Sequence, residues 1–254
     1  MPRLAGKVAL VTGGAMGIGR HYSQALAAEG ARVMIADIED GSVVVQELAQ
    51  RHGANSAASA TFDVSDETSV KALVAQTLKH FGQIDVLVNN AAFYAKLKPR
   101  NFDEWDVETF DKVLAVNIRG PWLMVKHVAP HMKQRRSGKI INIASGAAYK
   151  GVPRMLPYVS SKGAMLAFSR ALSRELGDYG IAVNSLSPGY ILSDTGLENA
   201  THVEEERVPV RNSRAFKRDA YPEDLLGTLI FLASSDSDFV TGQSIVVDGG
   251  SVNN

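Results

Sequence analysis

The 254-residue sequence contains no cysteine. Without thiols the chain can form neither disulfides nor cysteine-based metal clusters, and it has no thiolate nucleophile. Its six histidines do not combine with carboxylates at the spacing of metal ligands. We therefore expect no metal site, and we expect the protein in a reducing compartment, by default the cytoplasm.

The sequence also lacks an excess of charge and a long apolar run. Its 27 basic residues balance 27 acidic residues, which removes the electrostatic argument for a nucleic-acid partner. The first apolar run, Val8–Val11, is too short for the core of a signal peptide or for a membrane span. We expect a small-molecule partner, no nucleic acid and no membrane.

Short apolar runs rich in β-branched residues alternate with longer stretches of helical period, which predicts strands alternating with helices. One helix is expected to begin at Asp66, a residue type suited to capping it. The predicted strands are Val8–Val11, Val33–Ala36, Ile84–Asn89, Ile140–Ile143, Ala182–Leu186 and Ser244–Val247, with a weaker one at Ser56–Phe62.

This alternation predicts the fold class. Nearly continuous apolar strands indicate a sheet covered on both faces, and intervening helices indicate parallel strands with right-handed crossovers. We predict an α/β protein: one doubly wound parallel-sheet domain over residues 1–254, of the Rossmann type, with its ligand at the carboxyl ends of the strands. A weakly patterned stretch at about 190–220 predicts a substrate loop or lid. Gly120 and Pro121 predict an irregularity in a helix.

A glycine-rich segment follows the first strand directly. Its glycines allow a tight turn and a close backbone approach to a pyrophosphate at a helix N-terminus, although such a segment can also merely connect a strand to a helix. The residues predicted to bind the cofactor here are Thr12, Gly13, Met16, Gly17, Ile18 and Gly19.

An acidic residue ends the second strand. Asp37 stands about twenty residues beyond the glycine segment, where a carboxylate accepts hydrogen bonds from the ribose hydroxyls of NAD and repels the 2′-phosphate of NADP. Met16 and Ile38 occupy flanking positions where a basic side chain would pair with that phosphate, and Arg20 is expected to point into the helix. The pattern therefore favours NAD.

Two further segments follow predicted strands. Asp63 and Val64 either border an adenine pocket or simply begin a helix, and the sequence leaves both interpretations open. Asn89 and Asn90 are followed by the small Ala91 and Ala92. These residues would stabilise the central sheet and let a cofactor ribose lie against the backbone, or they form an asparagine-rich turn.

The catalytic hypothesis rests on Tyr158 and Lys162, which are four residues apart and so project from one helix face. An adjacent ammonium and a positive nicotinamide ring would lower the pKa of the phenol, which would then exchange the alcohol proton. Ser145 follows a predicted strand and could polarise a carbonyl oxygen. Asn117, a buried amide on a helix, could hold a water that links Lys162 to solvent.

Taken together, these motifs resemble the short-chain dehydrogenase/reductase family over essentially the whole chain. The resemblance implies that Tyr158 is the general acid/base and that Ser145 orients the substrate oxygen. It implies that Lys162 binds the nicotinamide ribose and lowers the tyrosine pKa, and that Asn117 anchors a proton relay. The residues that carry the resemblance are the glycine segment with its leading threonine, Asn89-Asn90-Ala91, Asn117, Ser145, Tyr158, Lys162 and Pro188-Gly189.

The resemblance also covers the C-terminal part of the chain. It implies that Pro188, Gly189, Ile191 and Ser193 meet the nicotinamide carboxamide, and that the last strand packs across a two-fold axis in a homotetramer. Two departures stand out: Ala92 replaces the usual glycine, and the segment between Ala92 and Phe102 is longer than in many relatives. The longer segment is expected to reshape the rim of the pocket.

The predicted function is hydride transfer between a secondary alcohol or its ketone and NAD(H). The resemblance implies a cyclic, aromatic or sugar-derived substrate. Reduction of a carbon–carbon double bond uses a wider tyrosine-to-lysine spacing, so the four-residue interval argues against it. A sensor that binds NAD without turnover is the alternative from another class. Basic residues at 96–100 and 150–154 form either a solvated rim or a site for an anionic substrate.

Overall fold

In the computed structural model, which describes residues 2–193 and 203–252, the strands form one parallel sheet of order β3-β2-β1-β4-β5-β6-β7. All seven predicted strands are confirmed, with shifts of one or two residues at their ends. Their bounds are β1 Val8–Thr12, β2 Arg32–Asp37, β3 Ala57–Thr61, β4 Val86–Asn89, β5 Gly138–Ile143, β6 Ile181–Pro188 and β7 Ser244–Val247.

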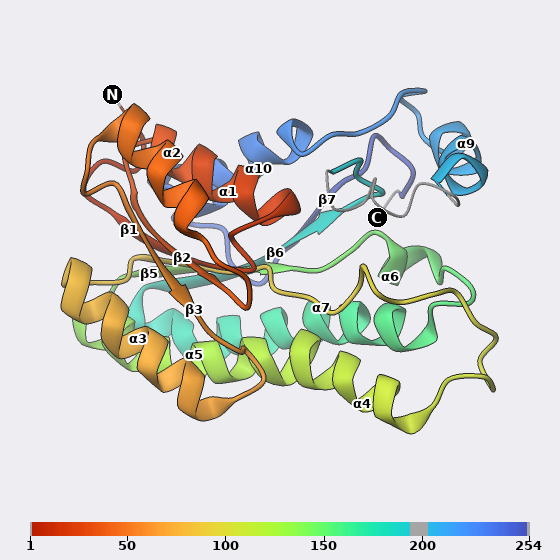
Figure 1. The fold of residues 1–254 in the computed structure, drawn as a ribbon, viewed down its shortest axis with the longest axis horizontal. Helices are drawn as coiled ribbons and strands as arrows, with labels where there is room; N and C mark the ends of the chain where they lie inside the picture. The colour runs from red at the N-terminus through yellow and green to blue at the C-terminus, as the bar shows by residue number, and fades with distance from the viewer. Residues whose placement is uncertain (1, 194–202, 253–254) are drawn as a thin grey trace.

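Helices cover both faces of this sheet, with α1, α2 and α10 on one side and α3, α5 and α7 on the other (Figure 1). The predicted doubly wound architecture is therefore confirmed. The α-helices are α1 Gly17–Ala28, α2 Ser42–His52, α3 Glu67–Phe81, α4 Val107–Leu114, α5 Gly120–Arg135, α6 Ala147–Lys150, α7 Leu156–Leu176, α9 Val203–Ser213 and α10 Glu223–Ala233. Shorter helical segments are η1 Ala115–Arg119, a π-helix, and the 3₁₀ turns η2 Gly177–Tyr179 and η3 Ser235–Ser237.

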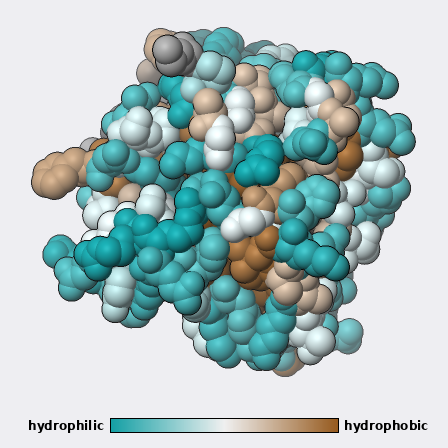
Figure 2. All heavy atoms as spheres, turned by 90° about the vertical axis from the view of Figure 1, so that its left-hand side faces the viewer, coloured by the Kyte–Doolittle hydropathy of each residue, from teal (hydrophilic) through white to brown (hydrophobic). Residues whose placement is uncertain are grey.

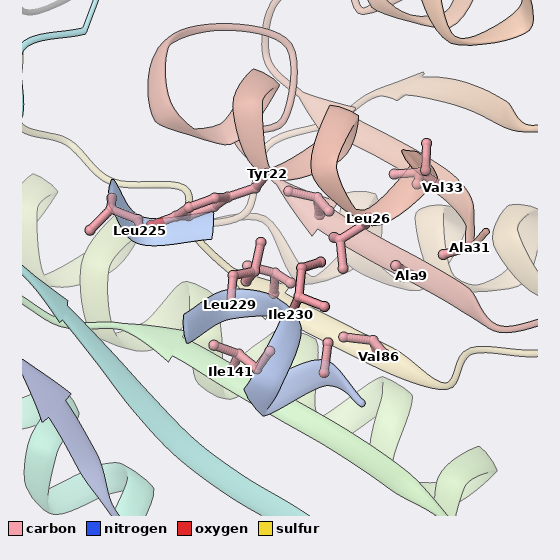
Figure 3. Packing of buried hydrophobic residues seen from close by; sticks show 14 of the residues in the cluster. Ala9, Tyr22, Leu26, Ala31, Val33, Val86, Ile141, Leu225, Leu229 and Ile230 are labelled. Atoms are coloured by element: carbon pink, nitrogen blue, oxygen red, sulfur yellow. The ribbon is translucent and has the colours of Figure 1, made fainter. Parts of the chain in front are cut away.

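The core has two halves because successive strand residues face opposite sides of the sheet. In β1, Ala9 and Val11 pack with Tyr22 and Leu26 of α1, together with apolar residues of α10 (Figure 3). Val8 and Leu10, by contrast, belong to the cluster under α3 and α5. Complete burial of each large apolar side chain stabilises the fold by about 1.5–3 kcal/mol, so both helical layers are held firmly on the sheet.

The helix that follows β3 begins where the sequence predicted. The Asp66 carboxylate accepts the backbone N–H groups of Thr68 at 3.0 Å and Ser69 at 3.2 Å. A cap of this kind stabilises a helix by about 1 kcal/mol. The predicted helix N-terminus is therefore confirmed.

The expected irregularity lies directly before Gly120 and Pro121. The chain from α4 to α5 passes through η1, whose five residues form a π-helix. Gly120 lies close to Val64, because a Cβ at this glycine would come within 2.7 Å of the valine side chain. Because Gly120 has no side chain, the start of α5 packs closely against Val64 in the connection between β3 and α3.

The stretch at about 190–220 is more regular than its sequence pattern indicated. Residues 203–213 form α9, and Ile191 pairs with Ala220 in a parallel bridge. We expected a loop here, and for this part of the stretch that expectation is wrong. Pro209 lies inside the helix. The sequence therefore did not predict a helix here, because proline normally interrupts one. Residues 194–202 lie outside the described part, and the role of a lid stays a prediction.

The two ends of the strands differ in their surroundings. In Figure 1, α6 and α9 lie beyond the carboxyl ends of the strands. Figure 2 shows the opposite side of the molecule, which is mainly hydrophilic around a narrow hydrophobic band. None of the described helices is long and apolar enough to cross a bilayer.

Candidate active site

The glycine segment forms a tight turn between β1 and α1, as predicted. Gly13 has a φ of +63° and Gly17 a φ of +50°, values that favour glycine. A Cβ at Gly19 would lie only 1.8 Å from the carbonyl oxygen of Gly13. Met16, which precedes the first helical residue, makes no side-chain cap, so the amino end of α1 retains N–H groups that can receive a phosphate.

Asp37 lies at the end of β2 beside the glycine segment, with 7% of its surface exposed. Its carboxylate accepts the N–H of Ala15 at 3.0 Å and that of Glu39 at 3.3 Å. Met16 and Ile38 are exposed on either side. The structure thus brings together the carboxylate and the two uncharged neighbours that the sequence singled out.

The side chain of Arg20 is held away from this position. It pairs with Glu47 of α2, whose second carboxylate oxygen accepts a hydrogen bond from Gln24. This agrees with the prediction that Arg20 does not serve as a partner for a 2′-phosphate.

The ends of β1 and β4 are joined by a network of Thr12 and Asn90. The hydroxyl of Thr12 accepts the N–H groups of Asn90 at 3.0 Å and Ala91 at 3.1 Å. The amide of Asn90 donates in turn to the carbonyl oxygens of Thr12 at 3.0 Å and Gly13 at 2.9 Å. Asn89 bonds to Asn142 of β5 at 2.8 Å, so both asparagines hold the central strands together. Ala92 is exposed after this junction.

The two interpretations of Asp63 can be compared directly. Its carboxylate accepts the backbone N–H of Ser65 at 2.8 Å and the hydroxyl of the same serine at 2.7 Å. This is the arrangement of an aspartate that shapes a turn at the start of a helix. Val64 is buried beside it. The observed bonds favour the turn, and contact with an adenine ring stays a prediction.

Ser145, Tyr158 and Lys162 meet at the carboxyl edge of β5. Ser145 follows this strand, and Tyr158 and Lys162 lie one turn apart on α7. The Nζ atom of Lys162 donates to the carbonyl oxygen of Ile143 at 2.7 Å and lies 5.8 Å from the centroid of the Tyr158 ring. The Ser145 hydroxyl lies close enough to the Tyr158 hydroxyl to favour its ionisation.

Burial governs the pKa values of this cluster. It raises the pKa of Tyr158 above its ordinary value, while the nearby Ser145 hydroxyl acts in the opposite direction. It also lowers the pKa of Lys162 to about 8. The lowered pKa that we expect for the tyrosine depends also on the positive ring of the bound cofactor and stays a prediction. In the protein alone the effect of burial is the larger one, because a phenolate in this site loses more hydration than the nearby groups replace.

Asn117 lies in the π-helix η1 and has different partners from those expected. Its side-chain oxygen accepts the N–H of Phe93 at 2.7 Å, and its amide nitrogen donates to the hydroxyl of Ser161 at 3.0 Å. The Ser161 hydroxyl donates to the carbonyl oxygen of Tyr158 at 2.7 Å. Asn117 therefore connects the segment after β4 to α7, and its part in a proton relay stays a prediction.

The segment after β6 closes the other side of the site. Gly146 donates its N–H to the carbonyl oxygen of Pro188 at 2.8 Å, and Gly189 donates to Val247 at 3.0 Å. Ile191 and Ser193 are buried further along. The structure thus places Pro188 and Gly189 next to the Ser145 segment.

Comparison with known proteins places these features in a family. Residues 13–252 match a family model described as enoyl-(acyl carrier protein) reductase. A short-chain type dehydrogenase/reductase from Bradyrhizobium diazoefficiens is 35% identical over 98% of this chain and 89% of its own. The chain belongs to the short-chain dehydrogenase/reductase family. Galactitol 2-dehydrogenase from Agrobacterium fabrum is 37% identical over 98% of both chains.

The fold of this short-chain dehydrogenase/reductase also matches a solved structure. The crystal structure of levodione reductase superposes with a TM-score of 0.87 at 29% identity, covering 97% of this chain and 98% of the other. The family consists of oxidoreductases that use NAD or NADP. Among the described residues no group of three histidines or acidic side chains could hold a metal ion.

Two buried polar residues of this family member, Ser161 and Arg214, were not predicted from the sequence. Ser161 is buried inside the Tyr158–Lys162 turn, where a serine carries no signal of its own. Arg214 is 3% exposed and donates to the carbonyl oxygens of Tyr190 at 2.6 Å and Arg218 at 2.8 Å. Nothing in the pattern distinguished it from the exposed basic residues around it.

The buried lysine predicts a pH dependence of stability. Its pKa is about 8 in the folded protein and 10.5 when unperturbed, so the unfolded chain binds more protons between these values. Lys162 should therefore add about 3 kcal/mol to the unfolding free energy of the protein without cofactor as the pH rises across this window. Urea unfolding at several pH values measures this rise. Lys162→Met should lack it, and parallel pH curves for the two proteins would contradict the assignment.

Proposed function

We propose that this short-chain dehydrogenase/reductase transfers a hydride between a secondary alcohol or its ketone and NAD(H), with Tyr158 as general acid/base. The observation that carries the proposal is the cluster of Ser145, Tyr158 and Lys162 at the carboxyl edge of the sheet. In a parallel sheet of this order, ligands bind at that edge, where the connections leave β1 and β4 in opposite directions.

Each residue of the cluster has a separate task. The Ser145 hydroxyl donates to the substrate oxygen and fixes its position. The Tyr158 hydroxyl exchanges a proton with the same oxygen, since a phenol held next to an ammonium can act in both directions. Lys162, held in place by the carbonyl oxygen of Ile143, brings the positive charge that opposes the effect of burial on the tyrosine pKa.

The site fits a dinucleotide. When bound, NAD accepts or supplies the hydride and brings a positive ring next to Tyr158. The amino end of α1 and the closely approaching Gly13 and Gly19 would hold the pyrophosphate, and Asp37 would accept the ribose hydroxyls. Asn90 and Ala91 border the same junction. We infer NAD rather than NADP, because Asp37 is flanked by uncharged side chains and Arg20 pairs with Glu47.

Exchange of Asp37 for asparagine tests the choice of cofactor. Asp37→Asn retains the shape of the side chain and removes its charge. NAD affinity should therefore fall about tenfold, which corresponds to the free energy lost when a hydrogen bond to a charged group becomes a neutral one. The preference for NAD over NADP should shrink at the same time. Calorimetric titration with both cofactors measures this. Glu39→Gln, which removes an exposed charge two residues away, is the matched control. An unchanged NAD to NADP ratio in Asp37→Asn would contradict the inference.

The substrate we propose is a cyclic, aromatic or sugar-derived secondary alcohol, with oxidation as the physiological direction. Formation of NADH over a panel of such alcohols tests the proposal, with NADP in place of NAD as a control. An α,β-unsaturated thioester is tested separately with NADH, whose oxidation would report reduction of the double bond, since the matching family model is described as an enoyl reductase. Turnover of the thioester alone would contradict alcohol oxidation. Tight NAD binding with no turnover at all would support a sensor.

We also propose that the protein is a cytoplasmic homotetramer. The support is the family resemblance, the lack of cysteine and the position of β7 at the edge of the sheet with its residues half-buried. Light scattering of the purified protein tests the assembly, and a monomeric mass would contradict it.

A further inference from the structure

An exposed aromatic side chain lies against the proposed general acid/base. The rings of Tyr94 and Tyr158 have centroids 4.6 Å apart at an angle of 41°. Tyr94 is 43% exposed, so packing in the core does not account for its position. The contact lies within the range in which aromatic rings attract one another. Tyr94 therefore presents an aromatic surface beside the ring that carries the reacting hydroxyl.

Asn117 holds the backbone next to Tyr94 in place. The oxygen of the Asn117 side chain holds the N–H of Phe93, the residue before Tyr94, and its nitrogen bonds to Ser161. Ser161 bonds in turn to the backbone of Tyr158. Three consecutive hydrogen bonds thus connect the backbone next to Tyr94 with the backbone of Tyr158. Asn117 and Ser161 are positioning residues in this arrangement.

A second set of contacts fixes the rest of the segment after β4. The N–H of Leu97 donates to the carbonyl oxygen of Tyr94 at 2.8 Å, which turns the chain directly after the ring. The N–H of Arg100 donates to the carbonyl oxygen of Arg154 at 2.9 Å, and the Arg154 side chain donates to Pro99 at 3.3 Å. The segment is therefore tied to the chain just before α7, and the backbone that carries Tyr94 is held in place.

Three basic residues of the segments 96–100 and 150–154 are already engaged within the protein. Arg100 lies 3.4 Å from the carboxylate of Asp106, and Lys150 bonds to the hydroxyl of Ser213 at 3.2 Å. Arg154 donates to a backbone carbonyl. These contacts favour a structural role for the three side chains over recognition of an anionic substrate.

From this geometry we propose that Tyr94 is a specificity-determining residue that selects secondary alcohols carried on a ring over open-chain polyols. The inference rests on the proposed function and deepens it. A cyclic or aryl substrate with its oxygen at Ser145 and Tyr158 lays an apolar face on the Tyr94 ring and gains contact area. An open-chain polyol would instead press hydroxyl groups against the ring, where they lose hydration without gaining hydrogen bonds.

Kinetic comparison of two substrate classes tests this proposal. Tyr94→Leu should lower kcat/KM for ring alcohols such as cyclohexanol and 1-phenylethanol about three- to tenfold, mainly through KM. The same variant should leave kcat/KM for galactitol unchanged or raise it, so the ratio between the classes falls. Tyr94→Phe keeps the ring and should behave as the wild type. Tyr179→Leu, which removes an exposed tyrosine from η2, is the control.

Binding measurements separate this proposal from the proposed function. Calorimetric titration of acetophenone into protein saturated with NAD, a pair between which no hydride can pass, reports contact with Tyr94 whatever the activity. Weaker binding in Tyr94→Leu but not in Tyr94→Phe supports the specificity role, whatever the activity. Equal binding in all variants, or an equal loss of kcat/KM for both substrate classes, overturns it.

Discussion

Replacement of Tyr158 by phenylalanine is expected to reduce turnover about 10²- to 10⁴-fold, the usual contribution of a positioned acid/base. The variant keeps the ring that contacts Tyr94 and loses only the hydroxyl. The cofactor segments at Gly13 and Asp37 are untouched, so the affinity for NAD should stay within a few-fold of the wild type. Steady-state kinetics and calorimetric titration measure the two effects separately.

Tyr149 offers the matched control for this substitution. It is a half-buried tyrosine in α6, four residues after Ser145, and the proposed chemistry gives it no proton to transfer. Tyr149→Phe should therefore retain turnover within a few-fold. Activity of Tyr158→Phe within tenfold of the wild type would contradict the assignment of this residue as general acid/base.

Replacement of Gly19 by alanine should weaken dinucleotide binding strongly and destabilise the fold. The added Cβ would lie 1.8 Å from the carbonyl oxygen of Gly13 and 2.6 Å from the amide nitrogen of Asn90. The backbone has to move, and this breaks the 2.9 Å bond between Asn90 and Gly13. Overpacking of this kind costs about 1–3 kcal/mol. We expect a loss of NAD affinity of about a hundredfold, since the segment that faces the pyrophosphate is displaced.

Gly227→Ala is the control for a helical glycine without such a neighbour. No atom lies within 4 Å of a Cβ at this position in α10, and alanine favours the helix by up to about 1 kcal/mol. Urea unfolding should therefore show a small gain in stability with unchanged NAD binding. If Gly19→Ala bound NAD like the wild type, the glycine segment would not be the pyrophosphate site.

The fold followed from the sequence because its signals are local. Runs such as Val8–Val11 are rich in β-branched residues, and the glycine segment after them marks a strand followed by a helix. Asp66 marked a helix start that the structure confirms. The helix α9 was missed, because Pro209 and the charged residues around it hide its period.

The site was predictable only in part. The sequence identified Asp37, Ser145, Tyr158 and Lys162, and the structure brings the last three together. It gave no signal for the contact between Tyr94 and Tyr158, because that contact joins two segments far apart in the chain.

The partners of Asn117 and the direction of the Tyr158 pKa also required coordinates. The bonds of Asn117 to Phe93 and Ser161 join residues distant in sequence. The pKa of Tyr158 depends on the balance between burial and nearby groups. Residue types and spacings determine neither of these features.

The transfer of deuterium from substrate to cofactor tests the central claim most directly. The protein is incubated with NAD and secondary alcohols that carry deuterium on the carbinol carbon, and the nicotinamide ring is then analysed by mass spectrometry. Hydride transfer predicts that the label appears on the ring with the wild type and is reduced at least a hundredfold with Tyr158→Phe. Saturating NAD with no label on the ring, for ring alcohols and polyols alike, would contradict the claim and favour a sensor.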